Sequence, residues 1–275
     1  MPAGETALDL NTQKNKVSLD HVVIIVNDLN ESIKNFRELG FQVQIGGVNG
    51  PVHNALIFFK DGTYIELTTP ISSKVRGLFK FLYSLGLLTL LEKIRPGLTP
   101  RFLFWFGGPI GLKDMCLRCD DLDKSLSNMA QQGMGVTPVQ SFSRQRADGK
   151  IASWRLGGPI DRALPFLIED LTPVEVRVPF KEACEHTNGV LGISAIVMDA
   201  HNARQLIERV QPSLGNTPNK DYAANLCDVK VRNADETPVT HLALELLVAN
   251  NTQTSLPMAL TSNAAISLVG AKRAA

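Results

Sequence analysis

Apolar residues over positions 17–70 follow a pattern typical of one β-α-β-β-β unit. β-Branched residues dominate from Val22 to Val26, which predicts a buried strand. Asn27 and Asp28 suit the N-terminal cap of a helix. From Leu29 the apolar positions are spaced four, three and three, which gives that helix one apolar face. Three further strands are expected, at residues 41–45, 54–59 and 64–68.

The same order of elements returns at a constant offset of 93 residues. The positions that keep their residue type are Asp28/Asp121, Leu29/Leu122, Ile33/Leu126, Phe36/Met129, Gly40/Gly133 and Val43/Val136. Because four of these pairs fall on one helix face, we interpret the pattern as an internal duplication. A weaker third copy begins at residue 192, and its closing strand is expected at residues 241–246.

These patterns divide an α+β chain into six parts. They are a disordered N-terminus (1–16), a first module (17–70), an apolar helical insertion (71–108), a second module (109–173), a partial third module (174–249) and a tail (250–275) that is poorly ordered at its end.

The insertion contains the most apolar stretch of the chain, residues 78–91. Lys80 and Gly86 interrupt it, and it is shorter than the roughly 20 apolar residues that cross a bilayer. It therefore predicts no transmembrane segment. Three roles stay open: helices packed on the core or in a dimer interface, a lid over an apolar ligand pocket, or a membrane-surface helix.

Composition narrows the class of protein. The chain has 275 residues, of which 44% are hydrophobic, and a formal net charge of +1. This near-neutral balance gives no electrostatic case for nucleic-acid binding. Residues 1–16 lack the apolar run of a signal peptide, so a reduced, cytoplasmic setting is expected. The chain contains no G-x-S-x-G elbow, no P-loop and no G-x-G-x-x-G after a strand.

The four cysteines do not look like a disulfide framework in a chain of this length. They are Cys116, Cys119, Cys184 and Cys227. Cys116 and Cys119 form a C-x-x-C, but residues three apart on a strand face opposite sides of it. We therefore favour buried free thiols over a metal or redox pair.

Paired units that open on LDHVVIIVNDL and close on YIEL resemble the vicinal-oxygen-chelate superfamily, which includes glyoxalase I and extradiol dioxygenases. More closely, residues 17–173 resemble the glyoxalase-like domain family, through DGTYIEL, GL…CLR.DDL and LPFLIED. The resemblance implies paired βαβββ modules that form a curled mixed sheet around a cavity.

The resemblance also implies a metal site at the first and last strands of both modules. On this sequence, the implied ligands are His21, Glu66, Asp114 and Glu169. Such a set suits a divalent metal (Mn, Fe, Zn, Ni or Mg), and Glu66 and Glu169 are also the candidate catalytic bases. Alternatives stay open, because Asp114 is next to Lys113 and Asp170 would replace Glu169 after a one-residue change of register.

Four further residues are candidates for substrate binding at the cavity. They are His53, Asn54, Arg144 and Trp154. The first two follow a Gly-rich turn, and Arg144 precedes a second turn, so all three also suit solvated positions. Trp154 also suits core packing.

Two functions follow from the resemblance. The first is a metal-dependent lyase, isomerase or dioxygenase that acts on a small oxygen-chelating metabolite, and the acidic ligand set favours it. The alternative is a metal-free protein that binds or sequesters a small molecule in the same cavity under the leucine-rich insertion. A third option is an interaction scaffold in which the insertion forms a homodimer.

Overall fold

The structure is a computed structural model that describes residues 17–146, 149–178, 182–211, 228–232, 242–250 and 253–270. The expected disorder of residues 1–16 lies outside the described residues, as do Cys227 and His241. None of the described helices is long and apolar enough to cross a membrane.

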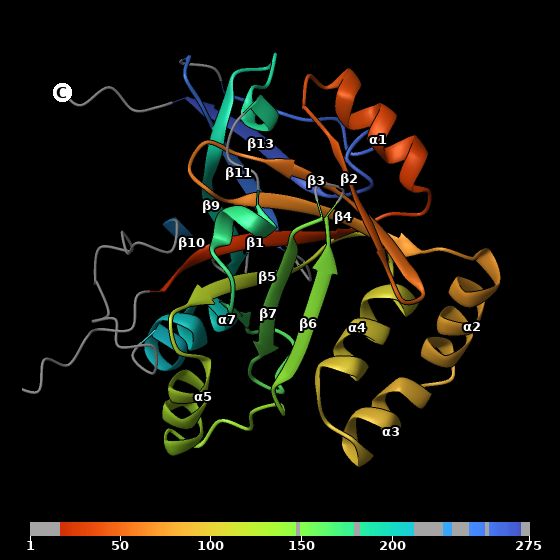
Figure 1. Ribbon diagram of the computed structural model, residues 1–275, viewed down its shortest axis with the longest axis vertical. Coiled ribbons are helices and arrows are strands. Elements are labelled where there is room, and N and C mark those ends of the chain that lie inside the picture. Colours follow the sequence, from red (N-terminus) through yellow and green to blue (C-terminus); the bar gives the residue numbers. More distant parts are fainter. Residues whose placement is uncertain are drawn as a thin grey trace, which may run out of the picture.

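Two βαβββ modules form one eight-stranded sheet in the order β2-β3-β4-β1-β5-β8-β7-β6 (Figure 1). The first module consists of β1 (Val17–Ile25), α1 (Leu29–Glu38), β2 (Gln44–Asn49), β3 (Val52–Phe58) and β4 (Tyr64–Pro70). The second consists of β5 (Gly111–Cys119), α5 (Leu122–Gln131), β6 (Gln140–Gln145), β7 (Ile151–Gly157) and β8 (Phe166–Asp170). Each opening strand is parallel to its closing strand, and β1 and β5 are antiparallel. The predicted fold class is confirmed.

The repeat extends to fine details of the two modules. Asp28 accepts a hydrogen bond from the backbone N–H of Glu31 at the start of α1, and Asp121 accepts one from Lys124 at the start of α5, both at 2.9 Å. The β1–β5 ladder has one register shift that skips Asp20 on β1 and another that skips residue 113 on β5. These bulged positions are again 93 residues apart (113 − 20), so His21 and Asp114 occupy equivalent positions.

The insertion is helical, as predicted. It consists of α2 (Ser73–Ser84), α3 (Leu87–Ile94) and α4 (Leu98–Gly107). Figure 1 shows the three helices as one lobe beside the large sheet, with α4 between α2 and the strands. A Cβ on Gly107 would lie 2.8 Å from the backbone oxygen of Phe79, so glycine permits the close approach of α4 and α2.

A second sheet follows, after α6 (Val174–Arg177) and a 3₁₀ turn (Glu182–Cys184). Its elements are β9 (Val190–Asp199), α7 (Ala200–Gln205) with a π-helical continuation (Leu206–Val210), β10 (Asp228–Arg232), β11 (Ala243–Val248), β12 (Gln253–Ser255) and β13 (Ala265–Gly270). The strand order is β10-β9-β11-β13-β12.

This second sheet repeats the middle of the first, β4-β1-β5-β8-β7, with the same parallel and antiparallel pairings. The predicted partial third module is therefore accompanied by a shortened fourth. The expectation that residues 241–246 form a closing strand is wrong, because β11 is antiparallel to β9 and takes the place of β5. Residues 253–270 supply β12 and β13 of the sheet and are not a tail.

The main core lies between the convex face of the large sheet, its helices α1 and α5, and the second sheet. A smaller core lies on the concave face, where Leu98 and Phe106 of α4 contact Val23, Cys116 and Phe166. Cys116 and Cys119 fall in different cores, so the two thiols face opposite sides of β5, as predicted. The concave face is the one that carries a cavity.

Candidate functional site

A cavity of about 540 Å³ lies between the concave face of the large sheet and the helices α2 and α4. Alternate residues of six strands point into it, as the period of two in a strand requires. The lining residues from these strands are His21, Val52, Asn54, Leu56, Phe58, Tyr64, Glu66, Thr68, Gln140, Phe142, Arg144, Trp154, Leu156, Phe166 and Ile168. The remaining lining residues are Gly50, Pro51, Phe79, Thr99, Phe102, Leu103, Trp105, Phe106 and Arg177.

Most of this wall is apolar and much of it aromatic. Phe142 and Trp154 stack with their ring planes 12° apart, and Trp105 of α4 contacts Phe166 at 5.7 Å between centroids. The charged and amide side chains of the wall are His21, Asn54 and Glu66 of the first module, Gln140 and Arg144 of β6, and Arg177 of α6. The cavity suits a largely apolar ligand with one polar end.

His21 has a charged partner directly before it in the chain. Its Nδ1 lies 2.7 Å from Oδ1 of Asp20, and its ring stacks on Tyr64 with centroids 4.6 Å apart. Consecutive residues of a regular strand point to opposite faces, but the bulge at Asp20 brings both side chains to the same face. Nε2 of His21 lies 3.7 Å from Oε2 of Glu66, which lines the cavity.

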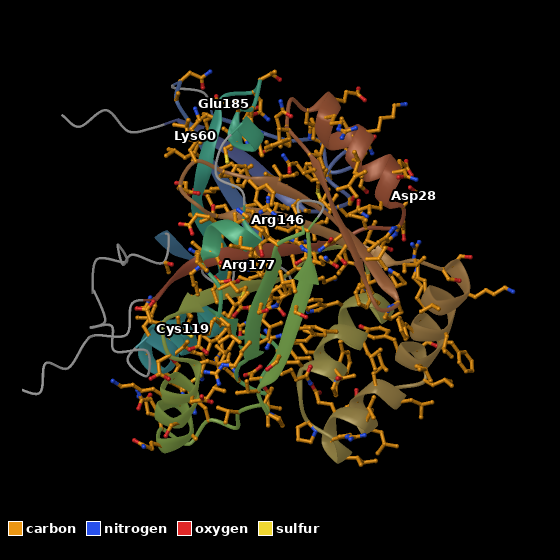
Figure 2. The ribbon with its side chains drawn as sticks, in the orientation of Figure 1. Asp28, Lys60, Cys119, Arg146, Arg177 and Glu185 are labelled. Atoms are coloured by element: carbon orange, nitrogen blue, oxygen red, sulfur yellow. The ribbon has the colours of Figure 1, made fainter. Side chains whose placement is uncertain are left out.

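A network of arginines holds Asp20 in place. Arg177 donates to both Asp20 oxygens, at 3.0 and 2.8 Å, and Arg118 donates to Oδ2 at 2.8 Å. Arg177 lies near the middle of the molecule (Figure 2) and also donates to Asp170 and to the hydroxyl of Tyr64. Burial alone would raise the pKa of Asp20, but Arg177 and His21 hold it well below its usual value. Asp20 is therefore a buried carboxylate in contact with the imidazole of His21.

Glu66 is positioned by Asn54. The amide Nδ2 of Asn54 donates to Oε1 of Glu66 at 2.7 Å, which leaves Oε2 toward His21. Among the described residues, Oδ1 of Asn54 has no hydrogen-bond partner, and it points at Gly46, where an added Cβ would lie only 2.2 Å away. Glycine at position 46 therefore leaves the space in which Asn54 can hold Glu66.

The other predicted substrate-binding residues divide between the two faces of the sheet. Arg144 and Trp154 line the cavity. Burial lowers the pKa of Arg144, and the nearby charges of Tyr64 and Glu66 oppose that shift. His53 does not line the cavity, because β3 turns Asn54 inward and so sends its neighbour to the opposite face.

Asp114 is not available as a metal ligand. Its carboxylate accepts two hydrogen bonds from Arg101, both of 2.7 Å, and one from Nε1 of Trp105 at 2.9 Å. Arg101 and Asp114 are both buried, and both donors come from α4. Helix α4 of the insertion therefore binds the side chain at position 114, which in the second module is equivalent to His21. The neighbouring Lys113, a predicted surface partner, has no part in this ion pair.

Glu169 also lies away from the cavity. It accepts a hydrogen bond from Arg155 at 2.6 Å, on the face of β8 opposite Phe166 and Ile168. The strand registers pair Val23 with Glu66 in the first module and Cys116 with Phe166 in the second. In the second module, the residue equivalent to Glu66 is thus Phe166. The prediction that Glu169 is the equivalent of Glu66 is wrong. Asp170, the alternative carboxylate, is bound to Arg177.

Among the described residues, one group of three potential metal donors lies together: Asp20, His21 and Cys116, with ligand atoms within 4.8 Å of one another. The group is a possible metal-binding triad, but Asp20 already binds two guanidinium groups, and burial raises the pKa of the Cys116 thiol well above its usual value.

The cavity itself offers too few donors for the implied metal centre. His21 and Glu66 come together, but Asp114 is bound to Arg101 and the fourth position is Phe166. A catalytic zinc site, for comparison, has about three protein ligands and one open position. The described residues therefore supply half of the predicted ligand set.

Asp20, Tyr64 and Arg177 were not among the residues predicted for the site. Asp20 stands directly before His21 in the sequence, but regular strand alternation would place it on the opposite face. Arg177 reaches Asp20 across 157 residues of chain, and no local pattern marks that contact.

Comparison with known proteins supports the same fold. Residues 19–214 match the family model described as a glyoxalase-like domain. No curated protein matches the chain. Of the solved structures, a hypothetical protein from Staphylococcus aureus is 12% identical, with a TM-score of 0.67, and the match covers 93% of this chain and 100% of that one.

Two other similar structures are more distant. The Mn(II)-bound glyoxalase from Novosphingobium aromaticivorans is 10% identical, with a TM-score of 0.46, over 93% of this chain and 83% of that one. The 2,3-dioxygenase LapB from Pseudomonas sp. KL28 is 9% identical, with a TM-score of 0.46, over 92% of both chains. Since the family model spans more than half of the sequence and two βαβββ modules share one sheet, this chain belongs to the glyoxalase-like domain family.

Proposed function

We propose that the cavity binds a small, largely apolar carbonyl compound and that His21 and Glu66 move a proton on the carbon next to its carbonyl group. The observation that carries the proposal is the 3.7 Å separation of His21 Nε2 and Glu66 Oε2 at the polar end of an aromatic cavity. Two bases this close can remove a proton at one atom and return it at another, which is the chemistry of an isomerase.

Each surrounding residue has a definite part in this chemistry. The carboxylate of Asp20 accepts the Nδ1 proton of His21, so Nε2 of the neutral ring is left to take a proton. Asn54 holds Oε1 of Glu66, and the charge of Arg144 stabilises negative charge that develops on the carbonyl oxygen. The aromatic wall excludes water, which strengthens these electrostatic interactions.

The proposal is tested by deuterium exchange. Phenylpyruvate, 2-hydroxyacetophenone and phenylacetaldehyde are incubated with the protein in D₂O, and loss of the α-proton signal is followed by ¹H NMR. We expect exchange above the buffer rate for at least one compound, reduced about 10²–10⁴-fold in His21→Gln and in Glu66→Gln. His53→Gln, on the opposite face of β3, is the matched control and retains full exchange. Exchange that persists in both site variants would overturn the proposal.

A second function, binding without chemistry, is favoured by the large apolar share of the wall. It predicts that the fluorescent probe N-phenyl-1-naphthylamine binds wild type and His21→Gln equally and is released by Trp105→Ala. Binding of this kind, with no α-proton exchange in any of the compounds, would favour a sequestering protein over an enzyme.

Metal dependence is measured on the same preparations. Elemental analysis of protein purified without chelators, together with thermal shifts in Mn²⁺, Fe²⁺, Zn²⁺, Ni²⁺ and Mg²⁺, reports any ion that binds the native state. Proton exchange by metal-free protein supports the acid–base proposal. Near-stoichiometric metal that is lost in both His21→Gln and Glu66→Gln would replace it with a metal-dependent mechanism.

A further inference from the structure

We propose that α2 and α3 dock on the surface of an anionic lipid bilayer. The docking face, here called the α2–α3 surface, consists of the apolar residues Leu78, Phe81, Leu85, Leu87, Leu90 and Ile94. Their exposed fractions range from 40% to 73%, although each is a large apolar side chain. Six such side chains are exposed on two helices that follow one another in the chain, whereas apolar residues scattered singly over a surface are ordinary.

The spacing of these residues places the exposed apolar side chains of each helix along one side of it. Leu78, Phe81 and Leu85 are spaced i, i+3, i+7, and so are Leu87, Leu90 and Ile94, so each set lies along one side of its helix. Leu88 of α3 is buried, so this helix has a second apolar side that packs inward. The outward apolar sides are therefore additional to those that hold the helices on the protein.

Exposed basic residues lie on the same two helices as the α2–α3 surface or directly after them. Lys74, Lys80, Lys93 and Arg95 are exposed, and none of them forms an ion pair within the part of the chain that the structure describes. The insertion contains one acidic residue, Glu92, which is bound to Arg162 at 2.8 Å. Four uncompensated positive charges beside exposed Leu, Phe and Ile side chains are typical of helices that lie in the interface of anionic membranes.

Charge also distinguishes a bilayer from a second copy of the chain. A two-fold dimer would bring the same patch from both subunits together. Lys74, Lys80, Lys93 and Arg95 of one copy would then approach those of the other, and this repulsion would oppose association. Anionic headgroups instead match the charge, and the acyl region receives the apolar side chains.

The helix α2, which carries part of the α2–α3 surface, also lines the cavity. Phe79 of α2 and Phe102 of α4 line the cavity, while Leu78 and Phe81 of α2 face outward. Figure 1 shows these helices together in one lobe, apart from α1 and α5. Docking through this lobe would place the apolar cavity beside the bilayer. The inference rests on the helices alone and does not depend on the proposed proton transfer.

Vesicle flotation tests the inference. The protein is mixed with vesicles of phosphatidylcholine alone or with added phosphatidylglycerol, at low and at high salt. We expect binding only to the anionic vesicles, weakened by salt. Lys74→Gln combined with Lys80→Gln should lower partitioning about 25-fold, because each basic residue near an anionic surface contributes about a fivefold factor. Leu78→Ser combined with Phe81→Ser should lower it roughly 30-fold.

A matched control comes from two apolar residues outside the insertion. Ile151 and Leu171 are 57% and 55% exposed, close to the values for Leu78 and Phe81. Ile151→Ser combined with Leu171→Ser should leave partitioning unchanged, and circular dichroism should show that every variant is folded. No binding of wild type to anionic vesicles, or an equal loss in the control, would overturn the inference. So would a stable dimer in analytical ultracentrifugation that Leu78→Ser with Phe81→Ser dissociates.

Discussion

Asp20 and His21 are consecutive residues whose side chains meet on one face of β1, with 2.7 Å between Oδ1 and Nδ1. The bulge at Asp20 produces this arrangement, since it adds one residue to β1 that has no partner on β5. The second module has the same bulge, but Lys113 and Asp114 stand there. Only the first module therefore combines a histidine with a buried carboxylate at this position.

This contact predicts the tautomer of His21. A carboxylate is only an acceptor, so the neutral imidazole must carry its proton on Nδ1. We expect ¹⁵N-labelled protein to show that the neutral ring of His21 carries its proton on Nδ1 and not on Nε2. In Asp20→Asn, the amide can donate as well as accept, and this preference should be lost. A neutral His21 protonated on Nε2 in wild type would contradict the arrangement.

The charge of Asp20 predicts how stability changes in acid. The partners of Asp20 hold its folded-state pKa below the ordinary value of 3.8. The stability that this group contributes is therefore fully present above pH 3.8 and is lost as the pH falls through the folded-state pKa. In Asp20→Asn, urea unfolding should show a loss of about 3–5 kcal/mol at neutral pH and a flatter dependence below pH 4. If the free energy of unfolding of the variant fell as steeply as that of wild type below pH 4, this expectation would be wrong.

Two residues that were predicted as metal ligands should respond very differently to substitution. Asp114→Asn leaves the buried guanidinium of Arg101 without its counter-ion, and we expect a loss of about 3–5 kcal/mol in the free energy of unfolding. Glu169→Gln removes a partly exposed ion pair with Arg155, which should change the free energy by about 1 kcal/mol or less. Denaturant titration measures both. Equal losses would mean that Asp114 does not have the structural role described here.

Much of the fold could be predicted from local patterns. Apolar periodicity and the caps at Asp28 and Asp121 depend on residues within a few positions of one another, so both modules and their offset are visible in the sequence. The helical insertion is visible for the same reason. The shortened fourth module was missed, because its opening strand β11 carries no recognisable cap or repeat.

The site was harder to predict because its contacts are not local. Arg101 reaches Asp114 from the insertion, and Arg177 reaches Asp20 from beyond the second module. Neither contact has a sequence signature. The mistake at Glu169 arose from register, since the loops before β8 differ in length from those before β4 and only strand pairing identifies Phe166 as the equivalent of Glu66.

Two glycines should respond in opposite directions when replaced by alanine. At Gly46 a Cβ would lie 2.2 Å from Oδ1 of Asn54, so Gly46→Ala must displace the amide that holds Glu66. We expect a loss of about 1–3 kcal/mol in stability and a reduction in proton exchange. Gly77, in α2, has no atoms within 4 Å of an added Cβ, so Gly77→Ala should stabilise the protein by about 0.5–1 kcal/mol. Thermal unfolding of the two variants decides this.

His186 links the start of the second sheet to the first module. Its Nδ1 accepts a hydrogen bond from the backbone N–H of Gln42 at 3.0 Å, and its Nε2 donates to the carbonyl of Phe58 at 2.9 Å. The adjacent ion pair of Lys60 and Glu185, at 2.8 Å, is labelled at the top of Figure 2. Protonation of Nδ1 would break the bond from Gln42, so the folded protein requires the neutral ring.

Burial lowers the pKa of His186 below its ordinary value of 6.5. The unfolded chain therefore binds this proton more readily, and the contribution of His186 to stability is present above pH 6.5 and lost as the pH falls through the folded-state pKa. We expect the free energy of unfolding of wild type to decrease from pH 7 to pH 5. His186→Gln has no group that titrates there, so it should be less stable at pH 7 and show a weaker decrease. If wild type and variant lose stability in parallel over this range, another group is responsible.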